Sequence, residues 1–400
     1  MASTLSRRTF LSSTVAGTFT AASAARVLGA NDRIRLGIIG TGGRGSYLMQ
    51  EAKKIGGIEW ISVCDAWDVR REKAESLVGT AVQKDADYRK LLDRRDIDAV
   101  IVATPDHWHS RMTVDACRAG KDVYVEKPMT SVPMQGHDVV KAVRDHKRIV
   151  QVGVQQRSMA NFIEAYEKIV KTGLLGEVHM VRTIWNANGG YLTPVPAGME
   201  QKPAGLDWDA FLGWLPKIPW DPKRYFNRFA YWDISTGGQT GGLFVHMVDV
   251  VHWYLSLTKP LAAVALGGIY QYSDGRDTPD NINFILEYPQ KLTVTFEATI
   301  TDMIPQNSAD IVFMGSGGRL SIFRGGYKYL PGQKNLSVGP LSGGGAPEGV
   351  HIARWLDSVR SRKEPNANVV DGHYSAMACH IGNIAYKKLA RVAWQKEWDL

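Results

Sequence analysis

The chain has 400 residues, of which 44% are hydrophobic and 22% are charged, as in ordinary soluble globular proteins. This length exceeds the size that one hydrophobic core usually serves, so two domains are expected. The formal net charge of +8 comes from Lys and Arg scattered along the chain rather than from basic runs, which argues against nucleic acid as a partner.

The three cysteines, Cys64, Cys117 and Cys379, lie far apart in apolar segments. Their spacing matches neither a disulfide framework nor a CxxC-type metal site, so we expect buried free thiols. No other cluster of residues suggests a metal site, and no metal is predicted.

Residues 1–30 have the layout of an export signal. Arg7 and Arg8 precede the apolar, small-residue run TFLSSTVAGTFTAASAA, and the pair resembles the twin-arginine signal of bacterial proteins that are exported after folding. The run is too short and too polar to span a bilayer, so we predict a periplasmic or otherwise exported protein without an integral membrane segment. Cleavage after Ala24 or after Ala30 stays open, and so does a tail whose two arginines occur by chance.

Apolar strands and amphipathic helices alternate from residue 31 to residue 156. Strand-like runs cover 33–40, 58–65, 96–105, 121–128 and 148–156, and helical spacing occurs at 46–55, 69–78 and 110–120. This alternation, with continuous apolar strands, predicts an α/β Rossmann domain with a doubly wound parallel sheet over residues 31–156.

The pattern changes over residues 157–400. A helix at about 160–173 and a strand at 177–185 precede an aromatic and Pro-rich stretch at 188–232, and a helix covers 241–257. Strand-like runs follow at 261–273, 281–288, 291–300 and 309–323, before two helices at 349–363 and 373–390. Strands in close succession predict an α+β domain with a large, mostly antiparallel open sheet.

Gly40, Gly42 and Gly45 form a G-x-G-x-x-G motif between the first predicted strand and the first predicted helix. In this context the glycines allow a tight turn and a close approach of a pyrophosphate to the helix N-terminus. Asp65 ends the second strand about 20 residues later, where a carboxylate accepts hydrogen bonds from ribose hydroxyls. We therefore predict dinucleotide binding, with NAD(H) favoured because Asp65 would repel the 2′-phosphate of NADP(H).

Arg70 and Arg71 follow Asp65 closely and leave NADP(H) open, since either guanidinium could bind a 2′-phosphate. We expect both side chains to lie on an exposed helix face instead. NAD(H) therefore stays the first choice of cofactor.

Three motifs occur in order along the chain: GTGGRG at 40–45, ATPDHWH at 103–109 and VYVEKPMT at 123–130. Together with the order of elements, they resemble the Gfo/Idh/MocA oxidoreductase family over roughly residues 33–390. The resemblance is closest to exported, glucose–fructose oxidoreductase-like members. It implies a Rossmann domain, a second domain whose open sheet usually makes the dimer contact, and an active site for sugars or cyclitols between the two.

The resemblance also indicates the cofactor-binding residues. Thr104, Pro105 and His109 would line the cofactor cleft, and Glu126 and Lys127 would lie beside the nicotinamide. With the glycine loop and the neighbouring strand ends, the expected set is Gly40, Thr41, Gly42, Gly43, Arg44, Gly45, Asp65, Thr104, Pro105, Trp108, His109, Glu126, Lys127 and Gln155.

Lys127 ends a parallel strand, and ligands of such sheets bind beyond the carboxyl ends of the strands. Its ammonium could hold a substrate hydroxyl and stabilise the alkoxide that develops as hydride leaves carbon. The family's second catalytic element is a helix with D-x-x-x-H, whose His moves the hydroxyl proton. His246 occupies the His position here, but Gly242 stands where the family has Asp.

The missing carboxylate leaves the partner of His246 open. Asp233 could substitute for it, and Tyr231 could donate a proton instead, since both precede the helix closely. We expect Asp249 to serve the packing of the helix rather than the reaction.

Aromatic residues concentrate around the predicted cleft. Sugars present apolar C–H faces that stack on aromatic rings, while polar groups bind their hydroxyls. We expect Trp185, Tyr191 and Trp232 to bind the substrate, with Arg157 as a polar contact.

An exported protein with a dinucleotide site needs a cofactor that stays bound, because free nucleotide is a cytoplasmic resource. We predict an NAD(P)-dependent oxidoreductase that transfers hydride on a sugar or cyclitol derivative, with a tightly bound cofactor, as a homodimer or homotetramer. Two alternatives stay open: an NAD-dependent glycosidase or lyase that works through a transient keto-sugar, and a non-catalytic sugar-binding relative.

Overall fold

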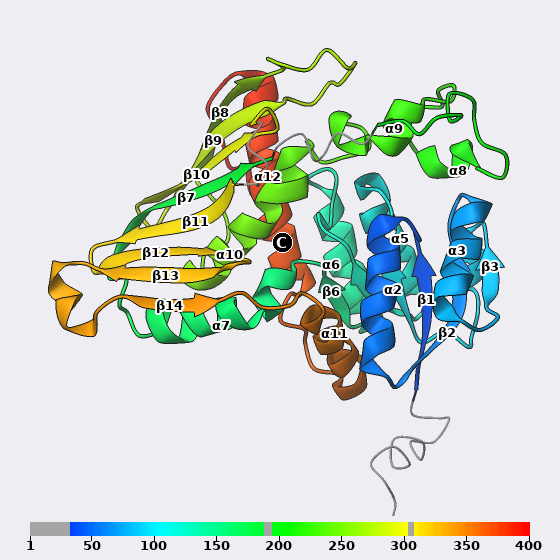
Figure 1. Ribbon diagram of the computed structural model, residues 1–400, viewed down its shortest axis with the longest axis horizontal. Coiled ribbons are helices and arrows are strands. Elements are labelled where there is room, and N and C mark those ends of the chain that lie inside the picture. Colours follow the sequence, from blue (N-terminus) through cyan, green and yellow to red (C-terminus); the bar gives the residue numbers. More distant parts are fainter. Residues whose placement is uncertain (1–32, 188–193, 303–307) are drawn as a thin grey trace, which may run out of the picture.

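The computed structural model describes residues 33–187, 194–302 and 308–400. The signal predicted at 1–30 and the candidate substrate residue Tyr191 lie outside the described residues. A parallel sheet and a larger second sheet stand on opposite sides of the molecule, with a long C-terminal helix, α12 (Val369–Lys388), between them (Figure 1). Within the described ranges, no helix is both long and apolar enough to cross a membrane.

The first sheet has six strands in the order β3-β2-β1-β4-β5-β6, and all its neighbouring pairs are parallel. The strands are β1 (Ile34–Ile39), β2 (Ile58–Cys64), β3 (Gln83–Asp85), β4 (Ala99–Val102), β5 (Asp122–Val125) and β6 (Val150–Val152). Every residue of β4 and β5 is buried, because helices cover both faces of the sheet. The predicted doubly wound parallel sheet is confirmed.

The helices of this half are α2 (Gly43–Ile55), α3 (Asp68–Val78), α4 (Tyr88–Leu92), α5 (Asp106–Arg118) and α6 (Gln135–His146). The edge strand β3 was not predicted, since its residues Gln83–Asp85 are polar and show no apolar alternation. The strand predicted at 148–156 is shorter than expected: β6 stops at Val152, and a 3₁₀ turn covers Gln155–Ser158.

The second sheet has nine strands in the order β14-β13-β12-β11-β7-β10-β9-β8-β15. Its strands are β7 (Val178–Asn186), β8 (Ala262–Gly268), β9 (Asn281–Tyr288), β10 (Leu292–Thr299), β11 (Ser308–Gly315), β12 (Gly318–Phe323), β13 (Gly326–Pro331), β14 (Leu341–Gly344) and β15 (Val392–Ala393). The pair β7 and β10 is parallel, whereas the other described pairs are antiparallel. The predicted large, mostly antiparallel sheet is therefore confirmed.

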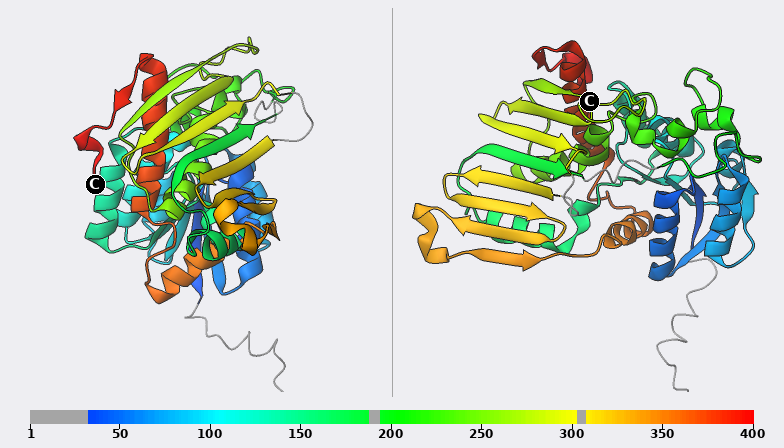
Figure 2. Two further views of the ribbon diagram at one scale, coloured as in Figure 1. Left: turned by 90° about the vertical axis from the view of Figure 1, so that its left-hand side faces the viewer. Right: turned by 45° about the horizontal axis from the view of Figure 1, so that its top comes forward.

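One face of the second sheet is covered by helices and the other is open (Figure 2). Along β9, residues Ile282, Phe284 and Leu286 are buried while the residues between them are exposed or half-buried. The helices of this half, besides α12, are α7 (Ala160–Ala165), α8 (Trp208–Leu212), α9 (Pro222–Phe226), α10 (Val245–Leu255) and α11 (Val350–Ser361). A π turn, Thr240–Phe244, leads into α10, and another, Tyr166–Val170, extends α7.

Helix α11 belongs to the second half of the sequence but packs into the first core. Its residues Ile352, Trp355 and Leu356 are buried in one cluster with Leu36 and Ile38 of β1. The boundary expected between residues 156 and 157 thus divides the chain, whereas the hydrophobic core of the Rossmann sheet takes in residues from near the C-terminal end.

Residues 205–229, called the roof segment here, carry α8 and α9 and lie over the Rossmann domain (Figures 1 and 2). Leu206 forms an isolated bridge with Trp67, and the N–H of Asp207 donates to the carbonyl oxygen of Ala66 at 2.9 Å. The roof segment therefore reaches back from the second half of the chain to the end of β2.

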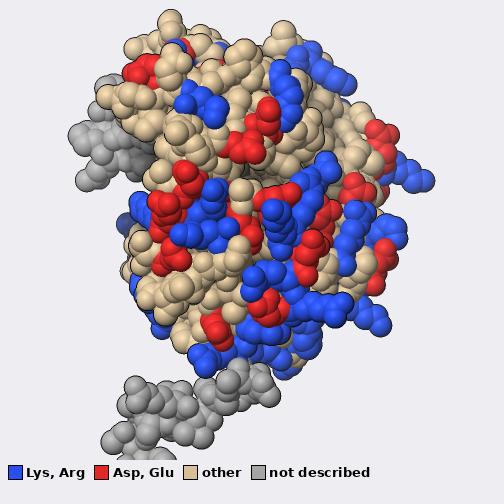
Figure 3. Space-filling view, turned by 90° about the vertical axis from the view of Figure 1, so that its right-hand side faces the viewer, with Lys and Arg blue, Asp and Glu red and all other residues tan. Residues whose placement is uncertain are grey.

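The surface over the Rossmann domain carries charges of both signs. In Figure 3 Lys and Arg are interspersed with Asp and Glu across the middle of this face, and Lys and Arg predominate toward its lower edge. Several of these charges form short-range pairs such as Lys84–Glu75 and Arg94–Asp96, which contribute little stability individually because solvent screens them.

Candidate active site

A cavity of about 1200 Å³ opens at the carboxyl ends of the parallel strands. Strand ends of the first sheet line one side, Trp185 of β7 and Arg324 after β12 line the opposite side, and the roof segment lines a third. The strand order reverses between β1 and β4, and ligands of doubly wound sheets bind at such a point.

The glycine loop at one end of the cavity has no room for side chains at two positions. Gly40 has a φ of +89°, and a Cβ there would lie 2.7 Å from the backbone of Ala103. A Cβ at Gly45 would lie 2.0 Å from the carbonyl oxygen of Gly40, whereas a Cβ at Gly43 would meet nothing within 4 Å. The loop thus leaves the N-terminus of α2 open to an anion, as a bound pyrophosphate requires.

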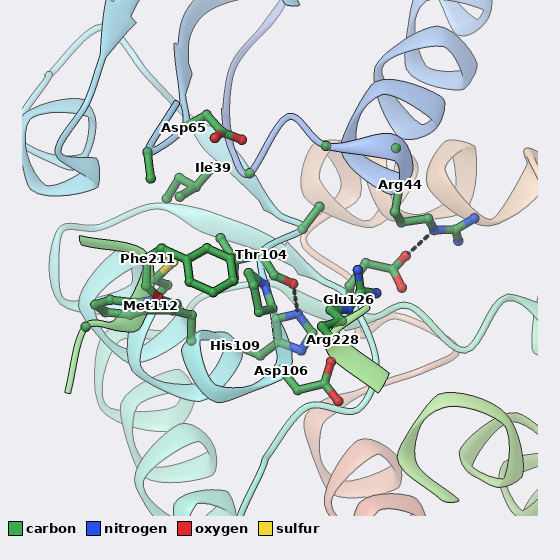
Figure 4. Close-up of a pocket in the computed structure, with 18 of the residues that line it drawn as sticks. Ile39, Arg44, Asp65, Thr104, Asp106, His109, Met112, Glu126, Phe211 and Arg228 are labelled. Atoms are coloured by element: carbon green, nitrogen blue, oxygen red, sulfur yellow. Dashed lines mark hydrogen bonds and ion pairs between the residues drawn. The ribbon is translucent and has the colours of Figure 1, made fainter. Parts of the chain in front are cut away.

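Asp65 borders the cavity at the end of β2 (Figure 4). Its carboxylate accepts hydrogen bonds from the backbone N–H groups of Thr41, at 2.8 Å, and Trp67, at 3.0 Å. These bonds fix the carboxylate beside the glycine loop. That is the place at which a carboxylate binds the adenosine ribose of a dinucleotide.

Arg70 and Arg71 are not on an exposed helix face, and that prediction is wrong. Arg70 borders the cavity, with its guanidinium 5.0 Å from the ring centre of Tyr225 in the roof segment. Arg71 donates to the carbonyl oxygen of Asp65 at 2.6 Å. Helical periodicity could not show this, because the roof segment that covers Arg70 comes from far along the chain.

Glu126 and Arg44 form an ion pair beside the other strand ends, with Arg44 Nε 2.7 Å from Glu126 Oε1 (Figure 4). Burial alone would raise the pKa of Glu126, but the positive charges of Arg44 and Lys127 outweigh it and hold the pKa below its usual value. His109 lies within hydrogen-bond distance of two backbone oxygens, Thr104 O at 2.8 Å and Pro128 O at 2.7 Å. It therefore ties the ends of β4 and β5 together.

Lys127 lies in the cavity wall at the end of β5, where its Nζ donates to the carbonyl oxygen of Gly242 at 2.9 Å. Burial lowers the pKa of Lys127 to about 8, against the opposing effect of the carboxylates of Glu126 and Asp106. A lysine with this pKa exchanges its proton near neutral pH, which suits a general acid or base.

His246 also lines the cavity and reaches it from α10. Burial, followed by the positive charge of Lys127, holds the pKa of His246 well below its usual value, so the imidazole is neutral at pH 7. Its Nδ1 is buried without a hydrogen-bond partner among the described residues. A neutral ring of this kind can accept or donate a hydrogen bond to a substrate hydroxyl.

Gly242 explains how this site differs from the family pattern with Asp. Its carbonyl oxygen holds Lys127, and a Cβ at this position would lie 2.8 Å from the ring of Phe229 in the roof segment. The aromatic ring thus occupies the space that a side chain would need.

Four residues predicted for the site do not reach the cavity. Asp233 binds Arg224 at 2.5 Å, and the same guanidinium lies 4.4 Å from the ring centre of Tyr231. Trp232 stacks on Tyr386 of α12. These three side chains therefore make contacts outside the cavity lining, and neither Asp233 nor Tyr231 replaces the missing carboxylate.

Arg157 is the fourth residue placed elsewhere. Its guanidinium is buried against Asp249 at 2.7 Å and Asp371 at 3.0 Å, so it joins α10 to α12. Asp249 thus serves packing, as expected. Proximity in sequence to a strand end suggested a substrate contact, but the carboxylates that bind Arg157 come from distant helices.

The remaining predicted residues line the cavity: Gly40, Gly42, Gly43, Arg44, Asp65, Thr104, Pro105, Trp108, His109, Glu126, Lys127, Gln155, Trp185 and His246. Thr41 and Gly45 support the loop from behind it. The Trp108 indole points its Nε1–H to the carbonyl oxygen of Phe211, at 2.9 Å, so this ring holds the roof segment.

Several lining residues were not predicted: Phe211, Trp214, Arg228, Arg324 and Glu348. The aromatic richness of 188–232 indicated part of the roof segment, but no sequence pattern pointed to the two arginines or to Glu348. Across the described residues, no group of three or more His, Cys, Asp or Glu side chains could hold a metal ion.

Comparison with known proteins decides the family. Residues 34–154 match the Gfo/Idh/MocA description "Oxidoreductase family, NAD-binding Rossmann fold", and residues 159–398 match the corresponding "C-terminal alpha/beta domain". The chain belongs to the Gfo/Idh/MocA oxidoreductase family. The family resemblance seen in the motifs is thereby confirmed, and the first domain of this family member is an NAD-binding Rossmann fold.

Curated relatives match over part of their length. A glycosyl hydrolase family 109 protein of Solibacter usitatus is 36% identical over 108 residues, which are 24% of this chain and 25% of the relative. Inositol 2-dehydrogenase of Salmonella typhimurium is 29% identical over 150 residues, or 37% of this chain and 44% of the relative. The matched part thus spans less than half of either relative.

Solved structures show the same fold over about 90% of the chain. Levoglucosan dehydrogenase in complex with NADH and levoglucosan has a TM-score of 0.72 at 17% identity, and the match covers 90% of this chain and 99% of that chain. Myo-inositol 2-dehydrogenase of Lactobacillus plantarum has a TM-score of 0.70 at 19% identity, over 91% of this chain and all of that one. At these identities the likeness concerns the fold.

The residues of this family member fit NAD. The open N-terminus of α2, the positions where Cβ atoms are excluded and the oriented Asp65 carboxylate are the features that a dinucleotide needs. Gly42, Gly43 and Arg44 would hold the pyrophosphate, Asp65 the adenosine ribose, and Thr104, Glu126 and Lys127 would border the nicotinamide end.

Proposed function

We propose that this protein is an NAD(H)-dependent oxidoreductase that oxidises or reduces a carbon of a sugar or cyclitol derivative. The observation that carries the proposal is Lys127. Its side chain is half-buried at the end of β5 with its pKa lowered to about 8, in the same cavity as the dinucleotide loop and His246. Relatives described as inositol 2-dehydrogenase support a polyhydroxylated substrate.

Two side chains handle the substrate hydroxyl. NAD⁺, when bound, would supply the hydride acceptor, and the proton of the substrate O–H group would pass to the protein. Lys127 Nζ, in its neutral form, takes this proton, because its pKa is about 8 whereas the lowered pKa of His246 makes the imidazole a weak base. His246, uncharged, orients the hydroxyl by a hydrogen bond, and Trp185 offers an apolar face to the ring.

We further propose that the cofactor stays bound through many turnovers. The roof segment covers the cavity and is held by three bonds to α5: His107 Nε2 and Trp108 Nε1 at the carbonyl oxygen of Phe211, and Trp214 Nε1 at the carbonyl oxygen of His107. Their lengths are 2.9 to 3.0 Å. A retained cofactor suits the export signal proposed for residues 1–30 and the glucose–fructose oxidoreductase-like character. NADP(H) is the second candidate nucleotide, since Arg70 borders the cofactor end of the cavity.

A glycosidase or lyase that forms a transient keto-sugar is the second candidate function. The matches to glycosyl hydrolase family 109 proteins favour it, because the chain shares 36% identity with one of them over the matched part. It would use the same Lys127 and His246, and its products would show no net redox change.

The proposed assembly is a homodimer or homotetramer through the open face of the second sheet. Val264 and Leu266 of β8 and Ile285 of β9 are exposed on that face, with 40%, 74% and 44% of their surface accessible. Apolar side chains that are exposed side by side mark interaction surfaces. Light scattering in solution tests this assembly.

One experiment tests the proposed function. Protein purified without added nucleotide is denatured, and the supernatant is assayed for NAD(H) and NADP(H) by mass spectrometry; native protein is then mixed with neutral and acidic sugars and cyclitols. Bound NAD with a change in nicotinamide absorbance supports the proposal. Bound NAD with unchanged absorbance, but with release of aglycone from glycosides, favours the second candidate. An empty site that does not bind NAD on titration contradicts both.

A further inference from the structure

Charged side chains of both signs border the substrate end of the cavity. Four are basic and three are carboxylates: Arg44, Lys127, Arg228 and Arg324, with Glu126, Glu348 and Asp106. Asp106 is buried, its Oδ2 accepts the backbone N–H of Thr236 at 3.0 Å, and its charge acts on Lys127. A charge that is shielded from water is costly unless an opposite charge is present.

Glu126 and Glu348 are each paired with another arginine. Glu126 binds Arg44 at 2.7 Å. Glu348 binds Arg324 at 2.6 Å, and it lies 3.5 Å from Arg44 and accepts a bond from Gln155 Nε2 at 3.1 Å. Neither carboxylate is therefore available to a further cation.

Arg228 forms no ion pair with any residue that the structure describes. It follows α9 in the roof segment, is half-buried, and lies over the ring of Phe229 at 4.7 Å from the ring centre. Its Nε is buried without a hydrogen-bond partner among the described residues. Arg228 borders the same cavity as Lys127, and Figure 4 labels it among the lining residues.

The electrostatic effect of Arg228 reaches the reactive amine. Its charge is among the influences that lower the pKa of Lys127, after burial. Arg324 acts in the same direction on His246, after burial and Lys127. The arginines thus lie near the two groups that we place at the substrate hydroxyl.

We infer that the substrate carries an oxyanion, as a carboxylate or a phosphate ester on the sugar or cyclitol, and that Arg228 binds it. A guanidinium binds such a group through two parallel N–H donors. The anion would supply the counter-ion that Arg228 lacks among the described residues. This inference rests on the proposed function, since it names the substrate class of the same site.

The test compares anionic and neutral substrates on NAD-loaded, full-length protein. Hexuronates and hexose 6-phosphates of several stereoisomers are paired with the corresponding neutral hexoses, and kcat/KM is read from nicotinamide absorbance. We expect an acidic member to exceed its neutral partner by about 30-fold or more, a typical effect for a charge-assisted pair. The comparison of hexuronates with phosphates identifies which oxyanion fits.

The variant Arg228→Gln sharpens the test. We expect it to lose the preference through a higher KM for the acidic substrate, while the neutral substrate changes by a smaller factor that follows the raised pKa of Lys127 and the nucleotide content is unchanged; Arg228→Lys should keep part of the preference. The control, Arg319→Gln, makes the same charge change at an exposed position of β12 and should behave as wild type.

Three results would overturn the inference. Turnover of neutral sugars at rates equal to or above those of acidic ones would do so while leaving the proposed function intact. Loss of bound nucleotide from Arg228→Gln would show that Arg228 holds the cofactor pyrophosphate instead. An equal loss with acidic and neutral substrates, accompanied by a shifted pH profile, would show that Arg228 acts through Lys127. No turnover of either class by NAD-loaded protein contradicts the proposed function itself.

Discussion

The two ends of the cavity are built in different ways. The cofactor end consists of three short backbone segments, each of them continuous in sequence: the glycine loop, the end of β2 and the start of α5. The substrate end combines single side chains from β5, β7, the roof segment, α10 and the loops after β12 and before α11. Backbone that binds an invariant ligand leaves a sequence motif, whereas side chains that recognise a particular substrate are scattered and leave none.

The largest expected effect comes from a substitution in the glycine loop at the cofactor end. Gly45→Ala places a Cβ only 2.0 Å from the carbonyl oxygen of Gly40. The loop must move to relieve this contact, and the pyrophosphate site is lost. We expect protein purified from cells to contain no nucleotide and to be inactive. The matched control is Gly344→Ala in β14, which adds the same atom in open space away from the cavity; loss of nucleotide there as well would contradict this account of the loop.

The next effect lies where the two ends meet. Lys127→Met keeps the length of the side chain but removes the amine that binds the carbonyl oxygen of Gly242. We expect kcat to fall by about 10³-fold, within the range for loss of a general acid or base, with the nucleotide content unchanged. Activity near the wild-type level would remove Lys127 from the reaction.

The pH profile separates Lys127 from His246 without a mutation. Oxidation needs neutral Lys127, so kcat/KM should rise about tenfold per pH unit below the pKa of about 8 and level off above it. His246 has a pKa well below 6.5 and is neutral throughout this window, so no second inflection is expected between pH 6 and 8. A profile that is flat from pH 6 to 9 would contradict the assignment of the proton to Lys127.

The smallest expected effect distinguishes Trp185 from Trp232, two tryptophans that the sequence predicted to bind the substrate. Trp185→Ala removes a cavity wall and should raise KM by about tenfold, since burial of an aromatic contact contributes about 1–2 kcal/mol. Trp232→Ala changes a ring that stacks on Tyr386 outside the cavity, and its kcat and KM should stay within about twofold of wild type. Equal effects of the two would place the substrate elsewhere.

Much of the fold could be predicted from the sequence because its signals are local. The apolar runs of β1, β4 and β5 are continuous, as strands buried on both faces must be, and the alternation in β9 and β10 shows which residues face the helices. β3, β13, β14 and β15 were not predicted; β3 and β15 have only three and two residues, too few positions for a period to emerge.

The substrate end was harder to predict for a physical reason. Asp233 was a reasonable candidate by distance along the chain, but Arg224 comes only nine residues earlier and binds its carboxylate. Arg157 was likewise a candidate, but its guanidinium forms ion pairs with Asp249 and Asp371. Which partner neutralises a charge depends on tertiary packing, and one sequence does not reveal it. Gly242 is the exception, because its departure from D-x-x-x-H was visible in the sequence. The sequence did not show that the ring of Phe229 occupies the space beside it.

The packing of α11 has a consequence for how the chain is made. Synthesis proceeds from the N-terminus, and all six strands of the first sheet have emerged before residue 160. The apolar faces of Leu36 and Ile38 nevertheless stay incompletely covered until Trp355 and Leu356 have left the ribosome. The Rossmann half of the growing chain therefore reaches its final stability only after most of the second sheet has been synthesised. A chain truncated before α11 would leave the cores of both halves incomplete.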